Sequence, residues 1–202
     1  MGCCSSDLAK GEQRLVPINV GDLVPSFALP THDGGHFDSS ACLKEKRFLV
    51  IRFTRGSWCP FCRRSLTQTQ ARLSDIEALG ATIVSIAPEG AASQAQNATA
   101  LGLSFPLLQD ADNAVAKQFG VVHVNAPLAA IAHDIIAHNT YVDGNTGATV
   151  VGKAESPHPV TYVVDAASGR VIASDVDSVN TMMRMSVDEI IAAIQQPKRD
   201  AF

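Results

Sequence analysis

The stretch FLVIRFTRGSWCPFCRRSL (48–66) joins an apolar run, a short turn and a helix-like segment that carries two cysteines. The run 48–53 is bounded by charged and polar residues, which is typical of a buried central strand. Apolar residues then recur at helical spacing over 60–79, and a proline is well suited to the first turn of that helix. The stretch therefore predicts a strand, a turn and a helix, with Cys59 at the helix N-terminus and Cys62 one turn inside it.

The remainder of the chain alternates predicted strands and helices, which is typical of a parallel α/β sheet. The last helix opens with a capping box, from Ser186 to Glu189. The order of elements matches a thioredoxin-like fold, with a central mixed β-sheet flanked by helices. Residues 1–19 are expected to be a flexible N-terminal extension and 20–197 one domain, with an insertion at 121–156 before the final hairpin. The predicted elements are an edge strand and hairpin at 21–37, strands at 81–88 and 104–110, helices at 91–103 and 113–120, a helical stretch at 127–137, a hairpin of 160–165 and 170–176, and a helix at 186–196.

Composition excludes several classes of protein. The 202 residues suit one domain, and 46% of them are hydrophobic, which is enough for a sizeable core. A net charge of −4 argues against nucleic-acid binding, which favours a basic patch. The sequence has no run of about 18 apolar residues and no apolar core of a secretory signal, so we expect neither a transmembrane helix nor export. Five cysteines at this low density favour a reducing compartment, where a close pair is catalytic or binds metal.

The first six residues, MGCCSS, fit a pattern for N-terminal acylation. Gly2 with Ser6 matches the N-myristoylation pattern, and Cys3 and Cys4 are placed for palmitoylation. One myristoyl chain holds a protein at a membrane only marginally, and a second lipid makes the anchor stable. Two readings stay open: a cytoplasmic protein tethered to the cytoplasmic face of a membrane, and a cytoplasmic protein with an unmodified tail.

The placement of the cysteine pair predicts redox chemistry. The unpaired N–H groups and the dipole at a helix N-terminus favour an anion, so a thiol there loses its proton more easily. Cys59 is expected to attack as the thiolate, and Cys62 lies within disulfide reach to resolve it. We expect Arg55, in the turn, to stabilise the thiolate and Trp58 to pack over the sulfur. The two arginines that follow Cys62 are more typical of a solvated helix face.

Metal binding and a structural disulfide are weaker readings of the pair. A structural zinc site needs four ligands, and the sequence has no second Cys-x-x-Cys and only scattered histidines. An inert disulfide would not need the start of a helix. We therefore expect no metal and no cofactor.

The segment FTRGSWCPFCRRSL (53–66) resembles the Phe-x-Arg-Gly-x-Trp-Cys-Pro-x-Cys segment of peroxiredoxin-like proteins of the alkyl hydroperoxide reductase/thiol-specific antioxidant (AhpC/TSA) family. The resemblance extends over about residues 20–196 and is poorest at 121–150. Its other segments are VGDLVPSFALPTHDGG (20–35), FPLLQDADNAVAKQFGV (105–121) and PHPVTYVVD (157–165).

This resemblance implies the reduction of hydroperoxides. The thiolate would attack the peroxide to give a sulfenic acid, which condenses with a second thiol. Thioredoxin, a glutaredoxin-type protein or a glutathione system would then reduce the disulfide. Pro60 matches the proline of the cysteine motif. Pro159 matches the cis-proline that faces the active-site cysteines in thioredoxin-like folds, and a cis bond is therefore expected there.

The sequence departs from the motif of peroxiredoxins proper, Pro-x-x-x-Thr/Ser-x-x-Cys. Arg52 stands at the proline position and Gly56 at the Thr/Ser position, so the hydroxyl that would orient the peroxide is absent. Thr54 and Ser57 are the candidates to replace it. The Cys-Pro-Phe-Cys pair is also similar to glutaredoxin, which keeps a protein thiol-disulfide oxidoreductase open as the alternative function.

Two other interpretations concern Arg184 and the class of function. Arg184 lies where the family often has an arginine, and two roles are open for it: contact with the active site, and the surface salt bridge that we favour. A tethered binding module with vestigial thiols is a third function class. The sequence does not determine the preferred peroxide, the physiological reductant or the oligomeric state.

Overall fold

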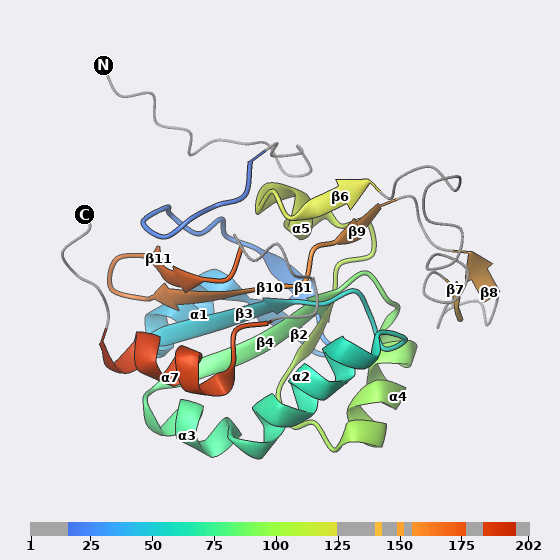
Figure 1. Cartoon of the computed structure of the whole chain (residues 1–202), viewed down its shortest axis with the longest axis horizontal. Coiled ribbons are helices and arrows are strands. Elements are labelled where there is room, and N and C mark those ends of the chain that lie inside the picture. The colour runs from blue at the N-terminus through green and yellow to red at the C-terminus, as the bar shows by residue number, and fades with distance from the viewer. Residues whose placement is uncertain (1–15, 125–139, 143–148, 152–154, 177–183, 197–202) are drawn as a thin grey trace.

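A computed structural model describes residues 16–124, 140–142, 149–151, 155–176 and 184–196 of the chain. Its centre is a five-stranded sheet in which β3 pairs in parallel with β4, and β4 in parallel with β5, whereas β10 and β11 run antiparallel (Figure 1). The predicted central mixed sheet is therefore confirmed. In spatial order the strands are β11 (Arg170–Ser174), β10 (Val160–Asp165), β3 (Phe48–Phe53), β4 (Ala81–Ala87) and β5 (Leu107–Gln109).

The central strand β3 is buried along its whole length, as its apolar composition predicts. Successive side chains of a strand point to opposite faces. Phe48 and Val50 pack with one cluster of core residues, and Leu49 and Ile51 pack with the other. By the same alternation, Arg52 points to the face of Phe48 and Val50.

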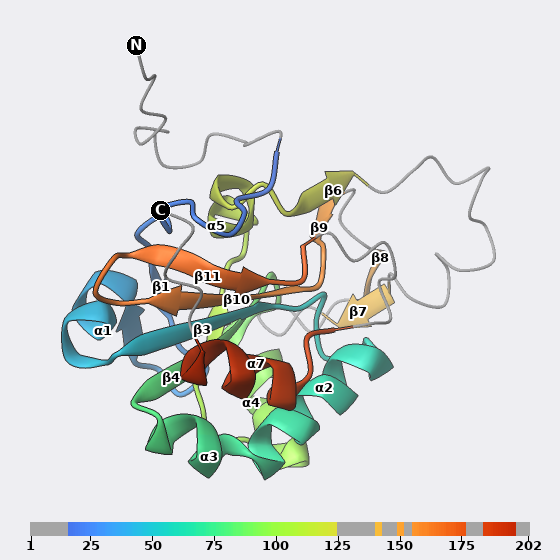
Figure 2. The same cartoon turned by 60° about the vertical axis from the view of Figure 1, so that its left-hand side comes forward.

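Helices cover both faces of the sheet, and each face has its own hydrophobic core (Figures 1 and 2). The core that contains Phe48 lies under α2 (Pro60–Ala71), α3 (Leu73–Ala78), α4 (Ala91–Leu101) and α7 (Val187–Gln195). The core that contains Leu49 lies under α1 (Ser39–Glu45), α5 (Ala114–Gln118) and the hairpin of β1 (Ala28–Pro30) and β2 (His36–Asp38).

Two helical segments differ from the sequence predictions. The helix expected over 60–79 is divided at Arg72, where φ −123° and ψ 18° interrupt the helical backbone. Helix α1 was not predicted, although its N-cap is a local signal, because the Asp38 carboxylate accepts hydrogen bonds from the N–H groups of Ser40 and Ala41. The predicted capping box at the start of α7 is confirmed.

The segment predicted as an insertion contributes short strands. β6 (Val122–Val124) pairs with β9 (Glu155–Pro157), and β7 (Thr140–Val142) pairs with β8 (Thr149–Val151). The helical stretch predicted at 127–137 lies outside the described residues. Towards the N-terminus, Ile18 is fully buried and its N–H donates to the carbonyl of Phe119 at 3.0 Å, so the flexible extension expected over 1–19 does not include this residue.

Candidate active site

Cys59 is the N-cap residue of α2, and Pro60 occupies the first helical turn, as the sequence predicts. The Cys59 sulfur accepts a hydrogen bond from the backbone N–H of Cys62 at 3.4 Å. Both cysteines are free thiols with no solvent exposure, whereas Pro60 is exposed. A sulfur at this position receives the unpaired N–H groups of the helix, which stabilise an anion.

The surroundings of Cys59 favour the thiolate strongly. The pKa of Cys59 is lowered to about 5, although burial opposes the decrease. The largest cause is a hydrogen bond from the Cys62 thiol, followed by the Cys62 N–H and then by the positive charge and hydrogen bond of Arg55. Nη2 of Arg55 donates to the Cys59 sulfur at 3.4 Å. The Arg55 guanidinium also lies 5.1 Å from the ring centroid of Trp58, which places a cation over an aromatic face. Thiolate is the nucleophilic form of cysteine, so Cys59 is set up to attack.

Cys62 is held in the opposite protonation state. Its hydrogen bond to the Cys59 sulfur, its burial and the negative charge of Cys59 raise the pKa of Cys62 well above the ordinary value, although the Arg184 charge opposes them. Since one thiol is an anion and the other is its hydrogen-bond donor, the pair shares a single proton. When Cys59 reacts, its negative charge is lost, and the Cys62 thiol no longer donates a hydrogen bond to it. Cys62 is then available for the next step.

Arg184 contacts the site, which is the less favoured of the two roles that the sequence leaves open for it. Its Nη2 donates to the Cys62 sulfur at 3.2 Å. Arg184 directly precedes Met185, whose side chain and carbonyl lie against the core beneath α2 and α7. Arg184 and Cys62 are thus in contact although 122 residues of sequence separate them. No local pattern around Arg184 reveals that contact.

Arg52 is the second basic residue that the sequence analysis did not place in the site. It is 2% exposed, and its guanidinium donates to the Ser65 carbonyl and hydroxyl, to the Thr69 hydroxyl at 2.9 Å and to the Met185 carbonyl at 2.9 Å. Burial, opposed by the charge of Asp175, lowers the pKa of Arg52 to about 10. The signal was present in the sequence, since an arginine in the middle of a buried strand requires partners on the covering helix.

Glu89 brings a carboxylate close to the turn before Cys59. The sequence around that turn, from Arg47 to Ser74, contains no acidic residue of its own. Its carboxylate is 3% exposed and accepts hydrogen bonds from the Ser57 N–H at 2.8 Å and from the Ser57 hydroxyl at 2.7 Å. Burial raises the pKa of Glu89, although these hydrogen bonds oppose the increase. Glu89 therefore anchors the 54–59 turn from the loop after β4.

Gly56 shows why the motif has no hydroxyl at this position. Its φ of +136° is a conformation that residues with a side chain rarely adopt. A Cβ there would lie 2.8 Å from the Glu89 carboxyl carbon and 2.9 Å from Nε1 of Trp58. No threonine or serine fits this backbone without displacing Glu89 or Trp58.

The two candidates for a replacement hydroxyl make other contacts. The Thr54 hydroxyl lies 3.5 Å from the Ser85 hydroxyl and from the Ile86 carbonyl, and the Ser57 hydroxyl donates to Glu89. The predicted peroxide-orienting role of Thr54 or Ser57 thus finds no support in their contacts. Arg55 is the side chain whose donor reaches the Cys59 sulfur.

Pro159 is buried at the start of β10, and Val160 pairs with Phe53 at the end of β3, where the turn to Cys59 begins. The described residues contain no cis peptide bond, so the expected cis bond at Pro159 is wrong. Only His158 and Pro159 separate strand β9 from strand β10, and trans is the lower-energy form of an X–Pro bond.

The remaining predictions concern ions and membranes. Among the described residues, no group of three or more His, Cys, Asp or Glu side chains could hold a metal ion. No helix in the described part of the chain is long and apolar enough to cross a membrane. Gly2, Cys3 and Cys4 lie outside the described residues.

Comparison with known proteins relates this chain to a family. A model of the AhpC/TSA family matches residues 20–173. The Mycobacterium tuberculosis protein named "Putative peroxiredoxin Rv2521" is 30% identical over 140 residues, which are 69% of this chain and 85% of that protein. "Peroxiredoxin Bcp" of Escherichia coli is 27% identical over 105 residues, which are 52% of this chain and 66% of that protein.

Solved structures share the fold. Peroxidoxin BcpB from Mycobacterium tuberculosis aligns with a TM-score of 0.66 at 21% identity, covering 87% of this chain and 96% of that one. A structure of Xanthomonas campestris peroxiredoxin Q aligns with a TM-score of 0.58 at 19% identity, covering 84% of this chain and 89% of that one. These likenesses agree with the thioredoxin-like architecture that the sequence predicts.

Proposed function

This chain belongs to the AhpC/TSA family, and we propose that it is a thiol-dependent peroxidase that reduces hydroperoxides through a dithiol–disulfide cycle of Cys59 and Cys62. The observation that carries the proposal is the Cys59 sulfur at the N-terminus of α2, with its pKa lowered to about 5 and Cys62 as its hydrogen-bond donor. A thiolate with its partner one helical turn away suits this cycle better than it suits metal binding.

The cycle follows from the protonation states of the two thiols. The Cys59 thiolate attacks one oxygen of ROOH, the O–O bond breaks, and Cys59 becomes a sulfenic acid while RO⁻ takes up a proton and leaves as ROH. The Cys62 sulfur then attacks the sulfenic sulfur, and water leaves as the Cys59–Cys62 disulfide forms. A thioredoxin-type dithiol returns both sulfurs to the reduced state and is itself oxidised to a disulfide.

Arg55 is the group that we assign to the peroxide. Its Nη2 lies 3.4 Å from the Cys59 sulfur, so a peroxide approaching that sulfur also comes within reach of the guanidinium. A charge-assisted hydrogen bond stabilises the developing negative charge on the leaving oxygen. In this proposal Arg55 takes over the role of the hydroxyl that the Gly56 backbone excludes.

The second candidate function is protein thiol-disulfide exchange without specificity for peroxide. Gly56 favours it, because the motif lacks the peroxide-orienting hydroxyl and its backbone leaves no room for one. Stopped-flow fluorescence of Trp58, the only tryptophan, separates the two functions. Rapid oxidation by micromolar hydroperoxide supports the peroxidase, whereas slow oxidation by peroxide together with fast exchange with a protein disulfide supports the alternative.

We also propose that the N-terminal segment is acylated at Gly2 and at Cys3 or Cys4, and that the protein acts in the cytoplasm at a membrane surface. The support is the MGCCSS sequence itself. Feeding cells an alkyne analogue of myristate should label the wild type and leave a Gly2→Ala variant unlabelled. Equal labelling of the two chains contradicts this assignment.

A further inference from the structure

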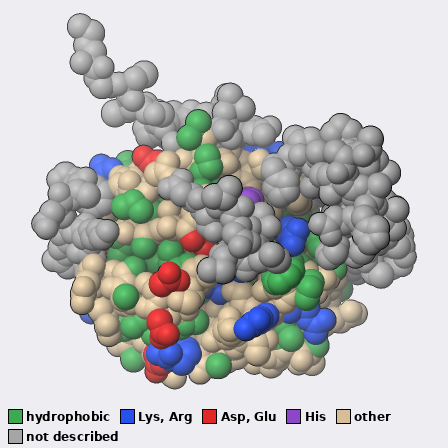
Figure 3. All heavy atoms as spheres, in the orientation of Figure 1, with side chains coloured by type: hydrophobic (Ala, Val, Ile, Leu, Met, Phe, Trp, Pro, Cys, Tyr) green, Lys and Arg blue, Asp and Glu red, His purple; other side chains and the backbone are tan. Residues whose placement is uncertain are grey.

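A cavity of about 290 Å³ lies between α2 and the chain that enters α7. Figure 3 shows basic side chains gathered over the region of α2, and none of the described residues that line the cavity is acidic. Neither Cys59 nor Cys62 lines it, so the cavity is separate from the reacting sulfurs. Its volume is near the lower end for pockets that hold small molecules. The described lining consists of Arg52, of Phe61, Arg64, Ser65 and Gln68 on α2, and of residues 184–187.

Three guanidinium groups reach the cavity from different elements. Arg52 lies on β3, Arg64 on α2, and Arg184 on the chain that enters α7. A guanidinium binds carboxylate and phosphate groups through a planar fork of N–H donors. A phosphate group has three acceptor oxygens that diverge from one atom, so donors on different sides can bind it together. A carboxylate has two oxygens in one plane and suits a single fork. The three directions therefore favour a phosphate group.

The Arg52 charge is not cancelled by the groups that hold it. Its hydrogen-bond acceptors are carbonyl and hydroxyl oxygens, and among the described residues its buried Nε atom has no partner. Burial is the main cause of the lowered pKa of Arg52, whereas Asp175 opposes the decrease and the positive charge of Arg184 adds to it. The Asp175 carboxylate is itself engaged by the N–H groups of Thr161 and Met185. An anion beside both guanidiniums would stabilise the two charges together.

Arg64 supplies a further charge that is available to a ligand. Its side chain is exposed, and within the described part of the chain it forms no ion pair or hydrogen bond. Arg63, the preceding residue on α2, is also exposed but does not line the cavity. The two neighbours therefore differ in the property that the experiment below needs.

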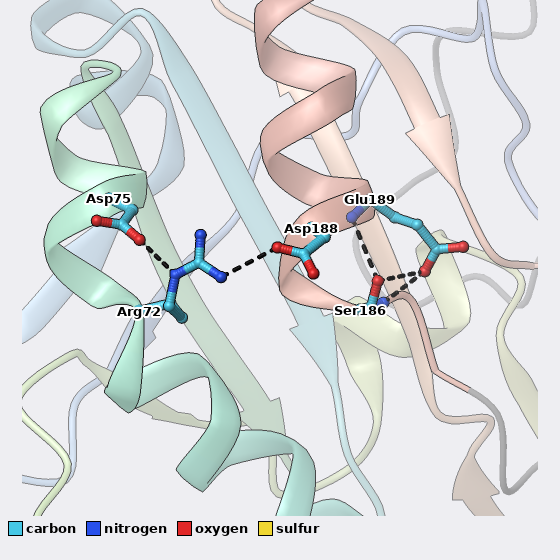
Figure 4. A network of polar contacts seen from close by, with 5 residues as sticks. All are labelled: Arg72, Asp75, Ser186, Asp188 and Glu189. Carbon is cyan, nitrogen blue, oxygen red and sulfur yellow. Dashed lines mark hydrogen bonds and ion pairs between the residues drawn. The ribbon is translucent and has the colours of Figure 1, made fainter.

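The N-terminus of α7 adds a further attraction for an anion. Ser186, the N-cap residue, and Val187, the first helical residue, line the cavity. The first N–H groups of a helix have no partner within it and favour a negative charge. The acidic side chains of this turn are engaged elsewhere, because Asp188 pairs with Arg72 at 3.0 Å and Glu189 binds Ser186 (Figure 4). The Arg72 pair also ties α7 to the junction of α2 and α3, which fixes the two walls of the cavity.

Arg184 connects the cavity with the resolving cysteine. The Cys62 sulfur is fully buried and a ligand in the cavity does not touch it, but Arg184 lines the cavity and donates to that sulfur at 3.2 Å. The hydrogen bond to Cys59 is the largest cause of the raised pKa of Cys62, and the Arg184 charge opposes the increase. A ligand that binds Arg184 would therefore weaken the one contact of the cavity lining that favours a Cys62 thiolate.

We propose that this cavity binds a phosphate group, as free phosphate or as a small phosphomonoester, and that the bound phosphate draws the Arg184 guanidinium away from the Cys62 sulfur. Arg52, Arg64 and Arg184 donate to the phosphate oxygens. Phe61, which is 39% exposed, contacts the organic part of an ester.

Binding of phosphate requires no redox activity, whereas its consequence rests on the proposed dithiol cycle. The rate at which a thiol attacks depends on its thiolate fraction. With Arg184 engaged by phosphate, Cys62 ionises less readily and attacks the Cys59 sulfenic acid more slowly. Phosphate thus regulates the resolving step without contact with either sulfur.

Isothermal titration calorimetry of the reduced full chain tests the binding site. Inorganic phosphate, phenyl phosphate and phenol are each titrated at the same ionic strength. We expect both phosphates to bind at one site per chain and phenol not to bind. Tighter binding of phenyl phosphate than of inorganic phosphate assigns the site to an ester, and equal affinity assigns it to free phosphate. Absence of saturable binding by both would overturn the proposal.

Two neighbouring variants locate the site. Arg64→Gln should weaken phosphate binding roughly tenfold, corresponding to about 1.4 kcal/mol. Arg63→Gln removes the same charge from the same helix outside the cavity lining, and it should leave the affinity unchanged. Equal losses in the two variants would mean unspecific attraction to the basic surface of α2 and would contradict a site in the cavity.

The effect on Cys62 is measured in Cys59→Ser, which removes the competing thiolate. Iodoacetamide labels Cys62 at pH 8, and peptide mass spectrometry gives the rate with and without saturating phenyl phosphate. We expect the ligand to slow labelling severalfold, and the same slowing to need roughly tenfold more ligand when Arg64→Gln is added. A rate that phenyl phosphate does not change would overturn the link to Cys62. If instead hydroperoxide fails to oxidise the wild type, the peroxidase function is wrong, while the binding and labelling results still stand.

Discussion

Two helices of this protein begin with the same hydrogen bond and differ in chemistry. Cys59 caps α2 by accepting the Cys62 N–H at 3.4 Å, and Ser186 caps α7 by accepting the Glu189 N–H at 3.2 Å. At α7 the anion is the Glu189 carboxylate, whose pKa is lowered by the backbone N–H and then by the hydroxyl of Ser186 (Figure 4). At α2 the anion is the capping atom itself.

The difference shows what converts a structural cap into a reactive one. Ser186 is exposed and its neighbours in the first turn, Asp188 and Glu189, are acidic. Cys59 is buried, its helix has no acidic residue in the first turn, and Arg55 and the Cys62 thiol donate to it. A helix N-terminus supplies only part of the stabilisation of an anion, and the donors around it supply the rest.

The largest expected effect comes from exchanging the two capping atoms. Cys59→Ser should reduce peroxidase turnover by at least about a thousandfold, because a serine hydroxyl has no accessible anion. Ser186→Cys should give a thiol that alkylates no faster than ordinary cysteine, because the cap there is exposed and beside Glu189. The rate of peroxide consumption measures the first variant, and peptide mass spectrometry after iodoacetamide treatment measures the second. If Cys59→Ser leaves every redox assay unchanged, the enzyme functions are wrong and the binding module with vestigial thiols is favoured.

Removing the second thiol should separate the first oxidation from turnover. In Cys62→Ala the disulfide cannot form, so Cys59 stops at the sulfenic acid, which dimedone traps. The variant also loses the hydrogen bond that contributes most to the low pKa of Cys59, so the first oxidation below pH 7 should be slower than in the wild type. Full turnover by this variant would show that another thiol resolves the intermediate.

Loss of the arginine at the reactive cap should have an intermediate effect. Arg55→Gln is expected to raise the pKa of Cys59, since the charge and the hydrogen bond of Arg55 both lower it. The peroxide rate at pH 6 should fall accordingly, and Arg55→Lys should restore part of it. Arg63→Gln, which removes a charge from the exposed face of the same helix, is the matched control and should leave the rate unchanged.

The smallest effect is expected at the structural cap. Ser186→Ala should lower the free energy of unfolding by about 1 kcal/mol, the usual cost of losing an N-cap hydroxyl. Ser186→Thr keeps the hydroxyl and should recover most of that loss. Urea unfolding measures both variants. A Ser186→Ala protein as stable as the wild type would mean that the capping box contributes nothing to α7.

The contrast between the two caps also marks what the sequence could predict. The strand, turn and helix around Cys59, the closing hairpin and the capping box of α7 all depend on residues close in sequence, and each was predicted. Arg184 and Glu89 reach the site across 122 and 32 residues, so only the packing of α7 and β4 beside α2 reveals them. Arg52 is intermediate, because its position in a buried strand was visible whereas its partners on α2 were not.

The central claim is that Cys59 is a thiolate at neutral pH, and its titration tests that claim most directly. The rate of iodoacetamide labelling of Cys59, followed by peptide mass spectrometry from pH 3 to pH 10, should rise through a midpoint near pH 5 and then stay level. A midpoint close to 9, the ordinary value for a thiol, would contradict the account.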